Sequence, residues 1–157
     1  MLANDAGKLL KEHGLMLAVA ESCTGGRLSD RLTDIPGSSE YFSGGVVSYS
    51  NRAKVDLLDV HERSLSLKGA VSEVVARQMA SGVRKAFHSD IGIGITGIAG
   101  PTGGTPTKPV GLVYICVSSV EGAVCTKNLF KGSRLKIKNQ AVEKALLMLI
   151  GFVKSKH

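Results

Sequence analysis

Short apolar runs that alternate with amphipathic stretches are the feature of this sequence that most limits its fold. Five runs have the length and composition of strands, at residues 15–20, 41–49, 91–96, 110–120 and 123–130. Most of the stretches between them repeat apolar residues every three or four positions, as one face of a helix does. Helices interleaved with apolar strands predict an α/β fold, here a three-layer α/β/α sandwich with a mixed, mostly parallel sheet.

Capping residues and glycines set the expected helix limits. Asn4 or Asp5 can cap a first helix, Thr24 or Gly25 can open a second, and Asn51 is a good cap for a third. The predicted helices cover residues 5–13, 24–33, 51–58, 62–67, 72–87 and 133–153, and the dipeptide at 121–122 marks a hairpin turn between the last two strands.

Length and composition predict one domain over residues 1–157, since 43% of the 157 residues are hydrophobic. No run of eighteen apolar residues predicts a membrane span, and the first residues lack the pattern of a signal peptide. We therefore expect a cytoplasmic protein that does not interact with membranes.

Charge is concentrated near the C-terminus, where residues 121–157 hold eight Lys and Arg but only two Asp and Glu. Such a bias is typical of proteins with anionic ligands, and it also fits a solvated helix face. Aromatic residues make up 4% of the chain and Trp is absent, so stacking platforms for nucleic acid are not expected.

Cysteine and histidine spacing predicts neither a metal site nor a disulfide framework. The three cysteines, Cys23, Cys116 and Cys125, form no CxxC pair, and their odd number argues against systematic pairing. The four histidines are scattered and lack the spacing of zinc ligands.

Ser22 follows the first predicted buried strand, where a side chain can face the crevice at the carboxyl edge of the sheet. The next residues, Thr24, Gly25 and Gly26, would begin a helix whose unpaired N–H groups could hold an oxyanion or a phosphate. Ser22 and Thr24 could equally act only as helix caps. Glu21, beside them, could orient a partner or serve as a cap.

Lys54 lies just after a second strand-to-helix junction. If Asn51 is the cap, Lys54 occupies the third helical position, where the helix dipole and burial would both lower its pKa. A neutral amine could then take the proton of a serine nucleophile. The alternative is a solvent-exposed lysine with no catalytic role.

Several weaker candidates surround these two residues. Tyr49 ends a strand and could contact substrate or only pack, and the loop from Gly97 to Gly104 could cradle a phosphate or form a long turn. The loop is not a Walker motif because it lacks Gly-Lys-Ser/Thr.

An ordered set of motifs resembles the CinA C-terminal domain family, and within it the PncC-type nicotinamide-nucleotide amidases. The matching blocks are Ala20-Glu-Ser-Cys-Thr-Gly-Gly, Pro36-Gly-Ser-Ser, Val47-Ser-Tyr-Ser-Asn-Arg-Ala-Lys, Gly69-Ala-Val-Ser, Gly94-Ile-Thr-Gly-Ile-Ala-Gly-Pro and Lys108-Pro-Val-Gly. Together they span the chain from about residue 15 to 135.

This resemblance implies hydrolysis of the carboxamide of nicotinamide mononucleotide to nicotinate mononucleotide and ammonia, without a metal or organic cofactor. It implies a catalytic dyad of Ser22 and Lys54 in a dimeric or otherwise homo-oligomeric protein. We expect the substrate contacts to come from Glu21, Thr24, Gly25, Gly26, Tyr49, Asn51, Thr96, Gly97, Gly100 and Arg134.

The chain departs from the family pattern near its last helix. The family usually has Gly-Asp-Arg there and an arginine four residues later, whereas this chain has Ser133 before Arg134, and then Lys138. Lysine lacks the planar fork that grips a phosphate in two places. A non-catalytic nucleotide-binding module, or a regulatory module associated with competence or DNA damage, is therefore the alternative function.

Overall fold

The computed structural model describes residues 1–157 and contains one sheet of five strands in the order β2-β1-β3-β4-β5. Strands β1, β2 and β3 run parallel, and β4 is antiparallel to both of its neighbours, so four of the five strands point the same way. The strands cover β1 (Leu17–Glu21), β2 (Phe42–Val47), β3 (Ile91–Gly97), β4 (Leu112–Ser119) and β5 (Gly122–Leu129).

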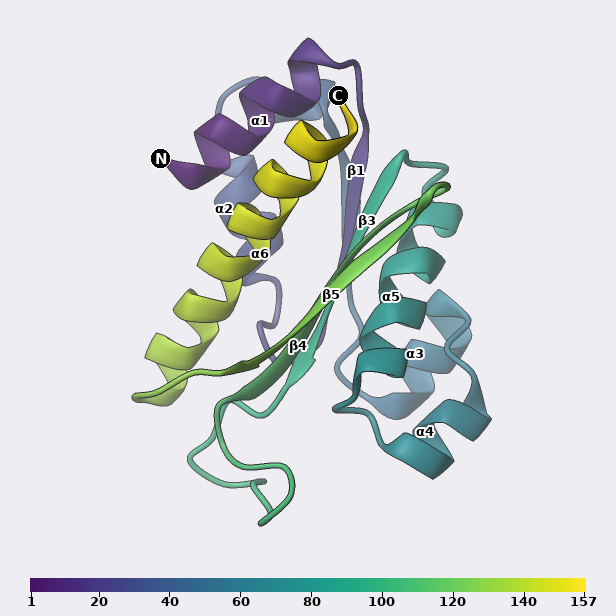
Figure 1. The fold of residues 1–157 in the computed structure, drawn as a ribbon, viewed down its shortest axis with the longest axis vertical. Helices are drawn as coiled ribbons and strands as arrows, with labels where there is room; N and C mark the ends of the chain where they lie inside the picture. The colour runs from purple at the N-terminus through teal and green to yellow at the C-terminus, as the bar shows by residue number, and fades with distance from the viewer.

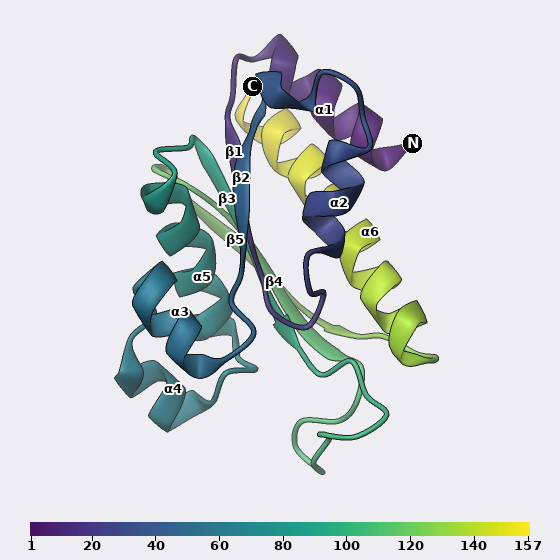
Figure 2. The same ribbon diagram turned by 180° about the vertical axis from the view of Figure 1, so that it is seen from behind.

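Helices cover both faces of this sheet (Figure 1, Figure 2). One layer consists of α1 (Leu2–Glu12), α2 (Arg27–Thr33) and α6 (Arg134–Lys156), and the other consists of α3 (Asn51–Leu58), α4 (Glu62–Lys68) and α5 (Glu73–Ala86). A short 3₁₀ helix, Ser38–Glu40, precedes β2. The predicted α/β/α sandwich with a mixed sheet is confirmed.

The core has a large cluster between the sheet and the α1, α2 and α6 layer, a smaller one under α3 and α5, and a third of three residues between α5 and β4. Every side chain of β1 is buried, because helices cover both sides of that central strand. In β3, Gly92 and Gly94 lie against the backbone carbonyls of Ala80 and Ala76, so α5 packs directly on the strand.

Two helix starts differ from the sequence prediction. Helix α2 begins at Arg27, because the residues from Ser22 to Gly26 form turns in which the Gly25 N–H donates to the Ser22 carbonyl at 3.1 Å. Helix α3 is capped by Ser50, whose hydroxyl accepts from the Ala53 N–H at 3.0 Å, so Asn51 is the first helical residue.

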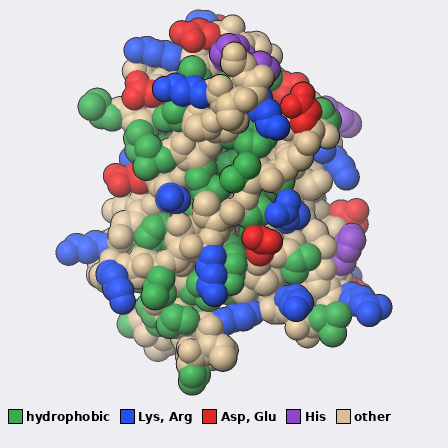
Figure 3. Space-filling model, viewed as in Figure 1, with side chains coloured by type: hydrophobic (Ala, Val, Ile, Leu, Met, Phe, Trp, Pro, Cys, Tyr) green, Lys and Arg blue, Asp and Glu red, His purple; other side chains and the backbone are tan.

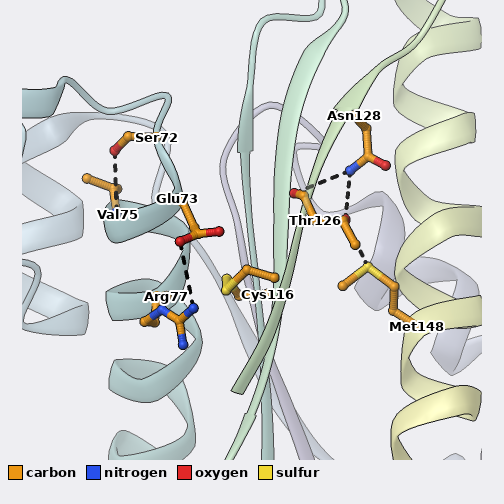
Figure 4. The surroundings of a disulfide bond; sticks show 9 residues. Ser72, Glu73, Val75, Arg77, Cys116, Thr126, Asn128 and Met148 are labelled. Carbon is orange, nitrogen blue, oxygen red and sulfur yellow. Dashed lines mark hydrogen bonds and ion pairs between the residues drawn. A yellow bond between two sulfur atoms is a disulfide. The ribbon is translucent and has the colours of Figure 1, made fainter. Parts of the chain in front are cut away.

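The odd cysteine count argues against a disulfide framework, but the structure contains one disulfide, between Cys116 and Cys125 (Figure 4). They lie directly opposite each other in the β4–β5 ladder, with their Cα atoms 4.1 Å apart. Residues opposite each other in an antiparallel pair point to the same face, which brings the two sulfur atoms together. Sequence spacing alone did not reveal this register. Cys23 is the remaining free cysteine and is buried.

Two further findings concern membrane-spanning helices and the distribution of basic side chains. None of the helices is both long enough and apolar enough to span a bilayer. On the face that carries α6 and β5, the Lys and Arg side chains are scattered among apolar and neutral ones and form no continuous patch (Figure 3). This distribution does not favour nucleic-acid binding over a solvated helix face.

Candidate active site

The side chains of Ser22 and Lys54 meet at the carboxyl edge of the sheet. Ser22 directly follows β1 and Lys54 is the fourth residue of α3, and the Lys54 Nζ lies 2.8 Å from the Ser22 Oγ. Both residues are nearly inaccessible to solvent, with exposed fractions of 8% and 1%. The contact joins residues that are thirty-two positions apart in the sequence.

A backbone carbonyl fixes the direction of the lysine amine. The Lys54 Nζ donates to the Ser48 carbonyl at 2.7 Å, and Ser48 itself is held to the end of β1 by its N–H, which donates to the Glu21 carbonyl at 2.8 Å. Because a carbonyl can only accept, one N–H of the amine must point toward Ser48. A neutral amine therefore has its lone pair free to accept the Ser22 hydroxyl proton.

Burial lowers the pKa of Lys54 from its ordinary value of 10.5 to about 8. The sequence predicted a lowered pKa from the helix dipole and from burial, and desolvation is the dominant cause in the structure. Cys23 is different, because burial raises the pKa of its thiol to about 12. Its thiolate is therefore scarce at neutral pH, and Ser22 remains the better candidate for a nucleophile.

The dyad opens onto a pocket of about 280 Å³ at the meeting point of β1, β3, α3 and the loop after β3. Six of the predicted substrate-contact residues line it: Tyr49, Asn51, Thr96, Gly97, Gly100 and Arg134. The hydroxyl of Thr96 already donates to the Ala70 carbonyl at 2.9 Å, so this side chain helps to shape the wall.

Arg134 lies across one side of this pocket. Its Nη1 donates to the Gly100 carbonyl at 2.6 Å and its Nη2 donates to the Tyr49 hydroxyl at 3.1 Å. The remaining N–H groups of the guanidinium are free for an anionic ligand. On the neighbouring loop, the N–H groups of Ala99, Gly100, Thr102 and Gly103 donate to no protein acceptor.

Four predicted contact residues do not line the pocket: Glu21, Thr24, Gly25 and Gly26. The Glu21 carboxylate is fully buried and accepts from the Leu28 N–H at 2.9 Å and from the Ser29 N–H at 2.9 Å. Its oxygens therefore hold the first turn of α2. The Thr24 hydroxyl is buried without a hydrogen-bond partner.

The turn after Ser22 still offers donors to the reacting group. The N–H groups of Cys23, Thr24 and Gly26 donate to no backbone carbonyl, whereas that of Gly25 is bonded to Ser22. Cys23 lines the pocket, so its N–H is the nearest candidate for binding an oxyanion at Ser22. Lys138 reaches this turn from α6, with its amine 3.6 Å from where a Cβ of Gly25 would lie.

Sequence reasoning missed several residues of the site. Ser48 acts through its backbone carbonyl, so no side-chain pattern could have revealed it. Ala70 and Val71 reach the pocket from the segment before α5, whereas Thr102 and Gly103 belong to the loop from Gly97 to Gly104 that was already a candidate phosphate cradle. The motif Gly69-Ala-Val-Ser was the one signal for the segment before α5.

The free energy of unfolding of the parent protein is expected to fall as pH falls from 10.5 to 8. Lys54→Met is expected to remove this dependence. The pKa of Lys54 is about 8 in the folded state and near 10.5 when unfolded, so the unfolded chain binds the extra proton between these pH values. The free energy of unfolding should therefore rise by about 3 kcal/mol as pH increases through this window. The same amount is lost as pH falls back to 8.

Urea denaturation at pH 7 and at pH 10.5 measures the effect. The unfolding free energy of the parent protein should rise between these pH values by about 3 kcal/mol more than that of Lys54→Met. Lys154→Met, at an exposed position of α6, is the matched control and should behave as the parent does. Equal pH dependence in all three proteins would contradict the assigned cost of burying the charged amine.

The likeness to known proteins extends over nearly the whole chain. Residues 1–153 match the model of the CinA C-terminal domain family. A CinA-like protein of Syntrophus aciditrophicus is 52% identical over 142 residues, which cover 90% of this chain and 34% of that protein. A CinA-like protein of Trichodesmium erythraeum is 61% identical over 123 residues, which cover 78% of this chain and 29% of that protein.

A solved structure is also similar to this chain over nearly its whole length. The crystal structure of the competence/damage inducible protein CihA from Agrobacterium tumefaciens matches with a TM-score of 0.91 at 38% identity, covering 96% of this chain and 94% of that chain. The present chain spans about a third of the length of the curated relatives it matches. On these matches, the chain belongs to the CinA C-terminal domain family.

Proposed function

We propose that this protein is an amidohydrolase that converts nicotinamide mononucleotide to nicotinate mononucleotide and ammonia, with Ser22 as nucleophile and Lys54 as general base. The observation that supports it most strongly is the 2.8 Å contact between the Lys54 Nζ and the Ser22 Oγ in a buried site. Serine is a weak nucleophile at its free pKa and needs such an adjacent base.

In the first half of the proposed reaction, neutral Lys54 takes the proton of Ser22 while the Ser22 Oγ attacks the carboxamide carbon. The Ser48 carbonyl takes one amine hydrogen, which leaves the lone pair of the neutral amine available to the hydroxyl. The N–H of Cys23 would stabilise the oxyanion. Lys54 then gives its proton to the leaving nitrogen, and ammonia departs from an acyl-Ser22 intermediate.

In the second half, Lys54 takes a proton from a water molecule, and the resulting hydroxide attacks the acyl carbon. The bond to Ser22 breaks, the Ser22 oxygen regains its proton from Lys54, and the carboxylic acid leaves. Lys54 carries every proton transfer of this scheme, so the scheme calls for no metal or organic cofactor.

The chemistry of the pocket fits a mononucleotide. The guanidinium of Arg134 and the free N–H groups of Ala99, Gly100 and Thr102 supply a cation and donors for a phosphate. Apolar wall residues such as Ile98 would pack against a pyridine ring.

Arg134→Gln is expected to raise the KM for nicotinamide mononucleotide by about tenfold or more, because a charge-assisted contact to phosphate is lost. The kcat should change much less, since the guanidinium hydrogen-bonds to Gly100 and Tyr49 and to neither residue of the dyad. The assay is ammonia release by the purified protein over a range of substrate concentrations. Lys136→Gln, an exposed lysine two residues along α6, is the control. An unchanged KM would remove Arg134 from the phosphate site.

A non-catalytic nucleotide-binding module is the second candidate, because Ser133 and Lys138 stand where the family usually has an acid and an arginine. This candidate predicts saturable binding of nicotinamide mononucleotide without ammonia release. The name of the Agrobacterium tumefaciens relative describes that protein as competence/damage inducible. The buried, partly deprotonated Lys54 favours the catalytic candidate.

A further inference from the structure

A second cavity of about 590 Å³ lies between the C-terminal end of α3 and one face of α5. It has no lining residue in common with the dyad pocket. The two cavities adjoin opposite ends of α3, since Asn51 and Lys54 line the dyad pocket whereas Leu57 and Asp59 line this one. The helices that form it, α3 and α5, pack side by side in one layer (Figure 2).

The α5 side of this groove has a floor of small side chains with a cation at each end. Ser81 and Ala86 carry small side chains, and the Leu58 carbonyl occupies the space over Gly82, so α3 packs directly on α5 there. Arg77 and Lys85 lie eight residues apart, which is about 12 Å along a helix. Both side chains are exposed and long, so they can turn toward each other and share one ligand with adjacent anionic groups.

Both cations are available to a ligand. Arg77 has one ion pair, to Glu73 at 3.8 Å, and both side chains of the pair are about half exposed. Such a pair is worth little in water and does not hold the guanidinium. Lys85 takes part in none of the ion pairs of the structure.

His61 adds a donor whose position is fixed. Its backbone N–H donates to the Gln78 Oε1 at 3.0 Å, and the Gln78 Nε2 lies 3.3 Å from the His61 Nδ1. This pairing makes Nδ1 the acceptor, so the neutral ring carries its hydrogen on Nε2. Gln78 thus holds a histidine with a free N–H on a wall of the groove.

The α3 side supplies complementary groups. Leu57 exposes 56% of its surface, and Asp59 follows the helix as its cap in a left-handed conformation. An apolar surface beside a carboxylate suits a ring that carries hydroxyl groups, because the carboxylate accepts hydrogen bonds from hydroxyls.

We propose that the groove between α3 and α5 is a second binding site, separate from the dyad pocket, that takes a nucleoside diphosphate. Its phosphates lie on Arg77 and Lys85, its ribose hydroxyls donate to Asp59, and its base packs on Leu57. Arginine suits phosphate because its planar fork can donate two parallel hydrogen bonds.

The test measures binding of ADP by isothermal titration calorimetry to the full chain and to three variants. ADP has no carboxamide, so it is not a substrate of the proposed amidase. Replacing both Arg77 and Lys85 by Gln should weaken ADP binding about tenfold or more, since charge-assisted contacts are lost. Arg134→Gln should leave this affinity unchanged, and Leu57→Ser should weaken it.

Three results would overturn the proposal. The first is the absence of saturable ADP binding to the parent at millimolar concentration. The second is loss of binding in Arg134→Gln but not in the Arg77/Lys85 variant, which would place ADP in the dyad pocket. The third is equal affinity for pyrophosphate and ADP, which would remove the nucleoside from the assignment. None of these results depends on ammonia release, so the proposed amidase activity is tested separately.

Discussion

Ser22→Ala is expected to lower ammonia release from nicotinamide mononucleotide by about 10⁴-fold, as the loss of a nucleophile does in hydrolases with a comparable catalytic group. The substitution removes the one side-chain oxygen that contacts the Lys54 Nζ and leaves the backbone of the turn in place. Without the acyl-enzyme route, Lys54 could only assist direct attack by water.

Cys23→Ala is the matched comparison for this variant. It removes the neighbouring thiol, which is buried and whose pKa burial raises to about 12, and it keeps the N–H that would contact an oxyanion. We expect its rate to stay within about tenfold of the parent rate, because only packing is lost. Initial rates at saturating substrate give both values, and thermal denaturation shows whether each variant is folded.

Near-parent ammonia release by folded Ser22→Ala would end the proposal of a serine nucleophile. A large loss in Cys23→Ala together with full activity in Ser22→Ala would transfer the role to the thiol. Loss in both variants with normal folding would indicate that the turn, and not one side chain, controls the rate.

The fold was predictable because its determinants are local. Each strand is a short apolar run, and each long helix carries one apolar face, such as Val142, Leu146 and Leu149 in α6. The predicted helix starts were less accurate where two possible capping residues lie next to each other. Ser50 and Asn51 are both good caps, and only the contact with the Ala53 N–H decides between them.

The site was predictable only in part, since its geometry depends on contacts between distant segments. Ser22 and Lys54 were identified from their junctions, and parallel pairing of β1 and β2 brings those junctions to one edge. Glu21 was expected to contact substrate or to serve as a cap, and its carboxylate accepts from the Leu28 and Ser29 N–H groups of α2. The disulfide was missed because it depends on the register of the β4–β5 hairpin, which places Cys116 opposite Cys125. The spacing of the two cysteines in the sequence does not reveal that register.

The pH dependence of ammonia release should follow the protonation of Lys54. Below a pKa of about 8 the protonated amine cannot accept the Ser22 proton, so kcat/KM should fall about tenfold for each pH unit. Above that pH the neutral amine predominates and the rate should level off. Initial rates at low substrate concentration from pH 6 to pH 9.5 give the profile.

Lys54→Arg separates proton transfer from charge at the same place. A guanidinium keeps its proton throughout this pH range, so the variant should show about 10⁴-fold less activity at every pH even though its positive charge is retained. Lys54→Ala should be equally slow but should regain activity when a small primary amine such as ethylamine is added, and more so at higher pH. A parent profile that is flat across pH 8, or an active Lys54→Arg, would show that Lys54 is not the base. Ser22 would then need another group to take its proton, and no other side chain hydrogen-bonds to its hydroxyl.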